Sequence, residues 1–88
     1  MNETFELSQQ LNSPYTDLVE LAASALARLD TSSRRQDKEL HTAYEKSILS
    51  ATENILNALK NHYPLDKKPF YQHLESMRKI RTMQFKHD

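Results

Sequence analysis

This sequence contains no glycine, no cysteine and no tryptophan. The absence of glycine bears first on the fold, because the tight turns of β-hairpins usually need glycine or asparagine at positive φ. It also bears on chemistry, since glycine-rich phosphate loops and the G-x-S-x-G elbow of serine hydrolases cannot be built without it. Alanine, leucine, glutamate, glutamine, lysine and arginine are plentiful, and these residues favour helices. The composition therefore predicts an all-α protein.

The absence of cysteine excludes disulfides, thiolate nucleophiles and zinc–thiolate sites. No stretch approaches the ~20 apolar residues of a membrane-spanning helix. The N-terminal residues are acidic and no apolar run follows them, which is unlike a secretory signal peptide. We therefore expect one small helical domain over residues 1–88, located in the cytoplasm.

Apolar spacing and turn residues predict the first two helices. A short first helix is expected over about 3–12, with three apolar contacts: Phe5, Leu7 and Leu11. A second helix over about 14–29 is expected to start at Pro14, which suits the first helical position, after Ser13 as N-cap. Its apolar residues follow the 3.6-residue period and should form one buried stripe: Tyr15, Leu18, Val19, Ala22, Leu26 and Leu29.

The third predicted helix, over about 35–62, is the longest. Its main apolar face consists of seven residues: Leu40, Tyr44, Ile48, Ala51, Ile55, Ala58 and Leu59. A second stripe, formed by Leu49, Leu56 and Tyr63, lies beside the first, and together they cover roughly half of the helix circumference. This width predicts a central helix that touches at least two others. The alternative is that the second stripe is an exposed interface.

Pro64 should end the third helix, because the residue before a proline avoids helical geometry. Asp66 is a plausible next N-cap, with Leu65 and Phe70 at the spacing of a hydrophobic staple. The last helix, over about 67–82, should bury four residues: Phe70, Leu74, Met77 and Ile80. Short loops between the helices indicate antiparallel neighbours. The sequence thus predicts an antiparallel four-helix bundle.

Charge is unevenly distributed along a chain whose net charge is zero. Residues 1–33 have a net charge of −4 and residues 34–88 a net charge of +4. Four basic residues gather near the C-terminus, where we expect them at or beyond the end of the last helix, in solvent: Arg78, Lys79, Arg81 and Lys86. Such an end can meet an acidic partner, nucleic acid or an anionic membrane. Alternatively, the helix macrodipole favours cations there.

No pattern in the sequence indicates catalysis. The chain has four histidines, but none forms an H-E-x-x-H pair and no two are three or four residues apart. We therefore expect no enzyme activity, no metal, no cofactor and no small-molecule substrate. Nucleic-acid binding is also disfavoured, because the basic excess lies at the end of the last helix at which bases are not usually read.

The C-terminal half carries a family resemblance. It contains Ile48-Leu49-Ser50-Ala51, the helical run 55–60, a Pro64-Leu65-Asp66 turn, and then Phe70-Tyr71-Gln72-His73-Leu74. This succession resembles the third helix, short polar turn and final helix of the pediocin-like (class IIa) bacteriocin immunity proteins. In that family the final helix contains a Tyr-Gln type pair, and a tail with an aromatic residue follows, where Phe85 stands here. The resemblance covers about residues 14–86 and implies an antiparallel four-helix bundle. The tail is shorter, ending at Asp88, which puts the family's packing of the tail in doubt.

What the resemblance implies is self-protection of a bacteriocin producer. Members of that family act in the cytoplasm against a pore-forming peptide whose receptor is a membrane-embedded mannose-type sugar transporter. They recognise the bacteriocin-occupied transporter from inside, with specificity in the C-terminal half. By resemblance, the partner-binding residues here are Gln72, Arg78, Lys79, Arg81, Phe85 and Lys86. Contact with the inner membrane surface beside the transporter would fit the basic residues among them.

Two other functions remain open. One is a small helical chaperone or adaptor, similar to those that hold type III secretion needle subunits and present a helical hairpin with a wide apolar face. An adaptor should expose the stripe of Leu49, Leu56 and Tyr63, whereas an immunity protein should bury it. A DNA-binding regulator is the third and least favoured alternative.

Overall fold

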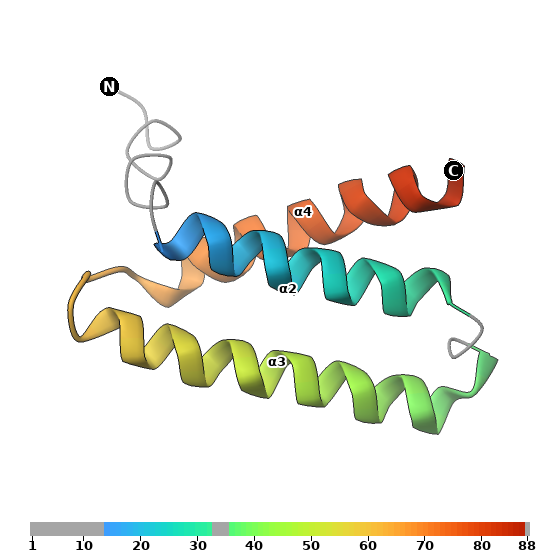
Figure 1. The fold of residues 1–88 in the computed structure, drawn as a ribbon, viewed down its shortest axis with the longest axis horizontal. Coiled ribbons are helices and arrows are strands. Elements are labelled where there is room, and N and C mark those ends of the chain that lie inside the picture. Colours follow the sequence, from blue (N-terminus) through green and yellow to red (C-terminus); the bar gives the residue numbers. More distant parts are fainter. Residues whose placement is uncertain (1–13, 33–35, 88) are drawn as a thin grey trace.

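The computed structural model describes residues 14–32 and 36–87, and this part of the chain is helical with no strand. It contains three helices, α2 (Pro14–Thr31), α3 (Lys38–Lys60) and α4 (Lys67–His87) (Figure 1). The all-α class is therefore confirmed, but three described helices do not support the predicted four-helix bundle. The first predicted helix, over about 3–12, lies outside the described residues.

Helix α2 forms where its apolar period predicts it. Pro14 is its first residue, as expected for a proline that lacks only an N–H the helix does not use there. All six residues of the predicted stripe are buried, with no more than 5% of any of them exposed. Beyond its end, the Ser32 hydroxyl donates a 2.9 Å hydrogen bond to the Leu29 carbonyl, which satisfies one of the last acceptors of the helix.

Helix α3 begins later than predicted because Asp37, rather than the polar residues before it, is its N-cap. The Asp37 carboxylate accepts a 3.1 Å hydrogen bond from the Leu40 N–H. Helix α4 begins at Lys67, as predicted, but continues five residues past the predicted end, to His87. No glycine or proline interrupts residues 70–87, and side chains of this last part pack onto α2.

The arrangement of the helices differs from the prediction. Helix α2 packs against both α3 and α4, whereas α3 and α4 have few close backbone approaches. In Figure 1, α2 runs antiparallel to α3 and in the same general direction as α4, which crosses behind it. Among the described helices, the central place therefore belongs to α2 and not to α3, the helix predicted to be central. The small side chains Ala22, Ala23 and Ala27, each at most 4% exposed, allow two neighbours to approach α2.

The core joins the stripe of α2 to a few residues from the other helices. Leu56 of α3, Leu65 of the loop, and Phe70 and Leu74 of α4 complete the buried cluster. Leu65 and Phe70 have the spacing of the predicted staple, and both belong to this cluster. The Tyr15 hydroxyl, at the start of α2, donates a hydrogen bond to the Tyr63 carbonyl.

Only part of the apolar surface of α3 is covered. Leu56 is fully buried and Leu49 packs partly buried against the core, but Tyr63 is 52% exposed. The second stripe is thus mainly core, as expected of a bundle. On the predicted main face, Leu40, Tyr44 and Ile55 are 40–47% exposed, and α3 has one close neighbour among the described helices rather than two. Ile80 of α4, also predicted as buried, is 47% exposed, since it lies about 120° around the helix from Leu74 at 100° per residue.

None of the described helices has a stretch that is both long enough and apolar enough to cross a membrane.

Candidate functional site

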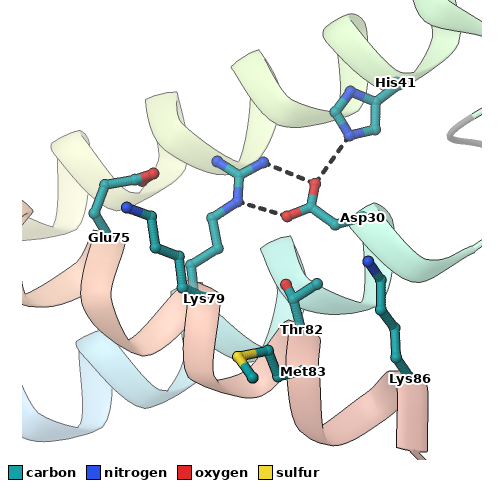
Figure 2. A pocket seen from close by; sticks show the side chains of 8 residues that line it. Asp30, His41, Glu75, Lys79, Thr82, Met83 and Lys86 are labelled. Atoms are coloured by element: carbon teal, nitrogen blue, oxygen red, sulfur yellow. Dashed lines mark hydrogen bonds and ion pairs between the residues drawn. The ribbon is translucent and has the colours of Figure 1, made fainter.

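A groove runs between α3 and α4 beside the C-terminal end of α2 (Figure 2). It has a volume of ≈ 630 Å³, and we refer to it as the α3–α4 groove. Eight residues line it: Asp30 from α2, His41 from α3, and Glu75, Arg78, Lys79, Thr82, Met83 and Lys86 from α4. The groove lies where the α3 and α4 backbones, which both pack closely on α2, have few close approaches to each other. Three of the six partner-binding residues predicted from the sequence line it.

Arg78 forms the closed side of the groove by bridging all three helices. Its Nε lies 2.7 Å from Asp30 Oδ2, and its Nη2 lies 2.8 Å from Asp30 Oδ1. The same Nη2 lies 2.6 Å from Glu45 Oε2 on α3. Only 14% of the Arg78 side chain is exposed. The fork of the guanidinium suits this two-point contact with a carboxylate.

The protonation states of this cluster follow from its contacts. The Arg78 hydrogen bonds lower the pKa of Asp30, and His41, whose Nε2 lies 3.0 Å from Asp30 Oδ1, acts in the same direction; desolvation partly opposes both. The Asp30 and Glu45 carboxylates in turn raise the pKa of Arg78. The cluster is therefore a charged ion-pair network at neutral pH, and its charges are used in joining the helices.

The open side of the groove is different, because its cations have no acidic partner within the described ranges. Lys79 and Lys86 are exposed and neither is in an ion pair there. Thr82 lies between them on α4, and its Oγ1 is buried without a hydrogen-bond partner in the described structure. Met83, 62% exposed, adds an apolar side chain. Figure 2 shows these four side chains along one helix.

The six predicted partner-binding residues divide between two faces of α4. Gln72, Lys79 and Lys86 are exposed, and their seven-residue spacing places them on one side of the helix. The other three are partly buried and contact α2 or α3: Arg78, Arg81 and Phe85.

The expectation that the four basic residues lie in solvent at or beyond the end of the last helix is wrong for Arg78 and Arg81, which are partly buried. All four of them lie within α4, which ends at His87. Arg81 forms an ion pair with Glu20 of α2, and the Arg28 guanidinium lies 6.0 Å from the centre of the Phe85 ring. The macrodipole is thus not the whole explanation, because Arg78 and Arg81 each meet a carboxylate of another helix.

A second polar cluster joins α3 and α4 near the other end of the molecule. The Oε1 of Glu53 on α3 lies 2.6 Å from Lys67 Nζ, and the Glu53 carboxylate also accepts a hydrogen bond from the Tyr71 hydroxyl. Desolvation and the Glu53 carboxylate raise the pKa of Tyr71 to about 12. The hydrogen bonds from Lys67 and Tyr71 lower the pKa of Glu53. Helical periodicity gave no signal for this cluster, because its members are 14 and 18 residues apart in sequence.

Within residues 14–32 and 36–87, no three His, Asp or Glu side chains gather in a way that could hold a metal ion. The exposed side chains of the groove on α4 include two lysine ammonium groups and one thioether, which are suited to binding. Searches with the sequence and with the structure found no matching family, no similar curated protein and no similar solved structure.

Proposed function

We propose that this chain is a cytoplasmic immunity protein that protects a producer cell by binding a bacteriocin-occupied sugar transporter. The proposal starts from the sequence resemblance to the pediocin-like bacteriocin immunity proteins over about residues 14–86. That resemblance also implies a fourth helix, which falls on residues outside the described part and stays a prediction. No catalytic step is proposed, since the function needs only recognition.

The observation that best supports a binding role is the exposed side of α4. Gln72, Lys79 and Lys86 follow one another at seven-residue intervals, which correspond to ~10.5 Å along a helix and a drift of only ~20° around it. Neither lysine has an acidic partner within the described structure. This side therefore presents free positive charge from a helix whose opposite side is fixed to α2.

The same side of α4 fits a position next to the membrane. A transporter embedded in the membrane brings its binding partner close to anionic lipid headgroups. Each Lys or Arg near such a surface contributes ~1 kcal/mol, so Lys79 and Lys86 together would contribute ~2 kcal/mol. Association with the inner membrane surface would thus add to recognition of the transporter.

The test is survival of a sensitive bacterial host challenged with a panel of pediocin-like peptides. We expect wild type to protect against at least one peptide, and Lys79→Gln with Lys86→Gln to lose most of that protection. The control is Lys38→Gln with Lys46→Gln, which removes the same charge from exposed positions on α3. Circular dichroism should show unchanged helix content for both pairs, because exposed unpaired charges contribute little stability.

Three results would count against this proposal. Absence of protection by wild type against every peptide would remove its basis. Full protection by the Lys79 and Lys86 variant would show that the exposed side of α4 is not the recognition surface. Equal loss in the α3 control would show that total charge matters rather than position.

The burial of Leu56 and the partial burial of Leu49 count against the adaptor. It stays a second candidate because other apolar side chains are exposed on α2 and α3. Leu21 of α2 is 71% exposed, and Leu40 and Ile55 of α3 are 40% and 47% exposed. Large exposed apolar surfaces often mark protein-binding sites. Replacing Leu40 and Ile55 with Gln should leave protection unchanged if the immunity proposal is right. A loss of protection by this folded variant would move the recognition surface to α3.

A further inference from the structure

The α3–α4 groove contains both neutralised and free charges, and the two kinds are separated. Arg78 is bound to Asp30 and Glu45, so the closed side of the groove has no spare cation. On the open side, Lys79 and Lys86 have no ion-pair partner within the described ranges. The local excess of positive charge is therefore confined to two turns of α4.

Thr82 lies between these two lysines and has an unused hydrogen-bonding group. Its Oγ1 is buried and finds no partner among the described residues, although buried hydroxyls are nearly always hydrogen-bonded. Hydroxyls within helices often donate to the carbonyl four residues earlier, as Thr52 does to Ile48 at 2.8 Å. Thr82 shows no such bond. Because this Oγ1 is buried, it can meet a ligand in the groove that Thr82 lines only after the side chain rotates.

We propose that the open side of the α3–α4 groove, formed by Lys79, Thr82, Met83 and Lys86, binds a short acidic peptide segment of a protein partner. The two ammonium groups bind carboxylates, the Thr82 side chain rotates so that its hydroxyl hydrogen-bonds the peptide, and Met83 contacts an apolar residue between its acidic ones. The inference rests on the proposed function in that it gives the chemistry of the partner surface recognised by α4.

The charges around the groove favour this ligand over other anions. Glu75 lines the same groove and is in no ion pair within the described ranges, so the continuous phosphate backbone of a nucleic acid would be repelled where it passes this carboxylate. A small phosphate ion is best held by an arginine fork, but Arg78 already donates to two carboxylates. A short acidic segment can place carboxylates beside Lys79 and Lys86 without extending past Glu75.

The experiment uses the full chain and two fluorescent pentapeptides. The probe has four acidic residues around one leucine, and its control has the matching amides in place of the acids. Binding is measured by fluorescence anisotropy at low and moderate salt, and the binding site is mapped by amide NMR shifts. We expect the acidic probe to bind with shifts confined to residues 75–86, and the amide probe to bind at least about tenfold more weakly.

Variants separate the contributions of charge and hydroxyl. Lys79→Gln with Lys86→Gln should weaken the acidic probe about tenfold or more, since it removes both charge-assisted contacts. Thr82→Val keeps the shape of the side chain and should weaken binding about threefold to tenfold by removing one hydrogen bond. The control, Lys38→Gln with Lys46→Gln, should bind like wild type.

Several outcomes would overturn the inference, including no binding of the acidic probe and equal binding of the amide probe. NMR shifts centred on α3, or equal weakening by the α3 control, would place the site elsewhere. Displacement of the probe by millimolar inorganic phosphate would indicate a general anion site rather than a peptide site. Probe binding without protection of the host would sink the immunity proposal alone, and protection without probe binding would sink this inference alone.

Discussion

Arg78→Gln is the substitution that most directly tests how the three helices are held together. Arg78 reaches from α4 to Asp30 of α2 and to Glu45 of α3 through hydrogen bonds of 2.6–2.8 Å. Glutamine keeps part of the side-chain length but has no charge and no guanidinium fork. The variant would leave Asp30, whose side chain is only 18% exposed, with His41 as its remaining partner.

The magnitude follows from how far this cluster is removed from water. Breaking a fully buried ion pair costs about 3–5 kcal/mol, whereas an exposed pair contributes about 0–1 kcal/mol. The side chains of Arg78 and Asp30 are 14% and 18% exposed, and that of Glu45 is 30% exposed, so the cluster lies between these limits. We expect a loss of about 2–3 kcal/mol, which for a domain of this size corresponds to a fall in Tm of about 10–20 °C.

The assay is urea unfolding followed by circular dichroism at two pH values. Arg78 lowers the pKa of Asp30 in the folded state, so this stabilisation is present above the unfolded pKa of about 3.9. It is lost as pH falls through the lower pKa of the folded protein. The difference between wild type and Arg78→Gln should therefore be large at pH 7 and should shrink below about pH 4.

Lys79→Gln is the matched control. Lys79 directly follows Arg78 on α4, but it is exposed and is in no ion pair within the described part of the chain. Its effect should remain within about 0.5 kcal/mol. The reasoning is refuted if the two variants unfold at the same urea concentration. It is also refuted if the loss caused by Arg78→Gln is the same at both pH values.

Two further predictions concern the core and the second polar cluster. Leu56→Ala should destabilise the protein by about 2–5 kcal/mol because the Leu56 side chain is fully buried. Ile55→Ala, at a half-exposed neighbour, should cost less than about 1.5 kcal/mol. Similar urea midpoints for the two variants would contradict the placing of Leu56, but not Ile55, in the core. In a phenolate absorbance titration, the transition that Tyr71→Phe removes should be centred near pH 12, and Glu53→Gln should move it to lower pH. A transition centred near pH 10, in a protein still folded by circular dichroism, would contradict the Tyr71 environment.

The sequence was informative where a helix buries one complete stripe. The stripe of α2 was predicted residue by residue, because its apolar positions repeat at the helical period and its other positions are mostly polar or small. The starts of α2 and α4 were also predicted, since Pro14 and the turn after Pro64 act through local geometry. These features depend on neighbours within a few residues.

The sequence failed where a pattern was compatible with more than one arrangement. The apolar surface of α3 is wide enough for two neighbours, yet Leu56 is buried while Ile55 beside it is 47% exposed. Periodicity gives the width of an apolar surface but not which part of it another helix covers. For the same reason, the end of α4 was predicted too early, since Arg81 and Phe85 are ordered by contacts with α2.

The sequence by itself determined that this protein is helical, through its lack of glycine and the spacing of its apolar residues, and it identified α4 as rich in basic residues. Only the tertiary structure decided which of those basic residues form ion pairs with carboxylates of other helices. Arg78 and its partner Asp30 are 48 residues apart, and Arg81 and Glu20 are 61 apart. Whether such charges meet depends on the rotation and offset of one helix against another, and these are fixed by packing on α2. Lys79 and Lys86 are exposed on the same helix and form no ion pair within the described ranges.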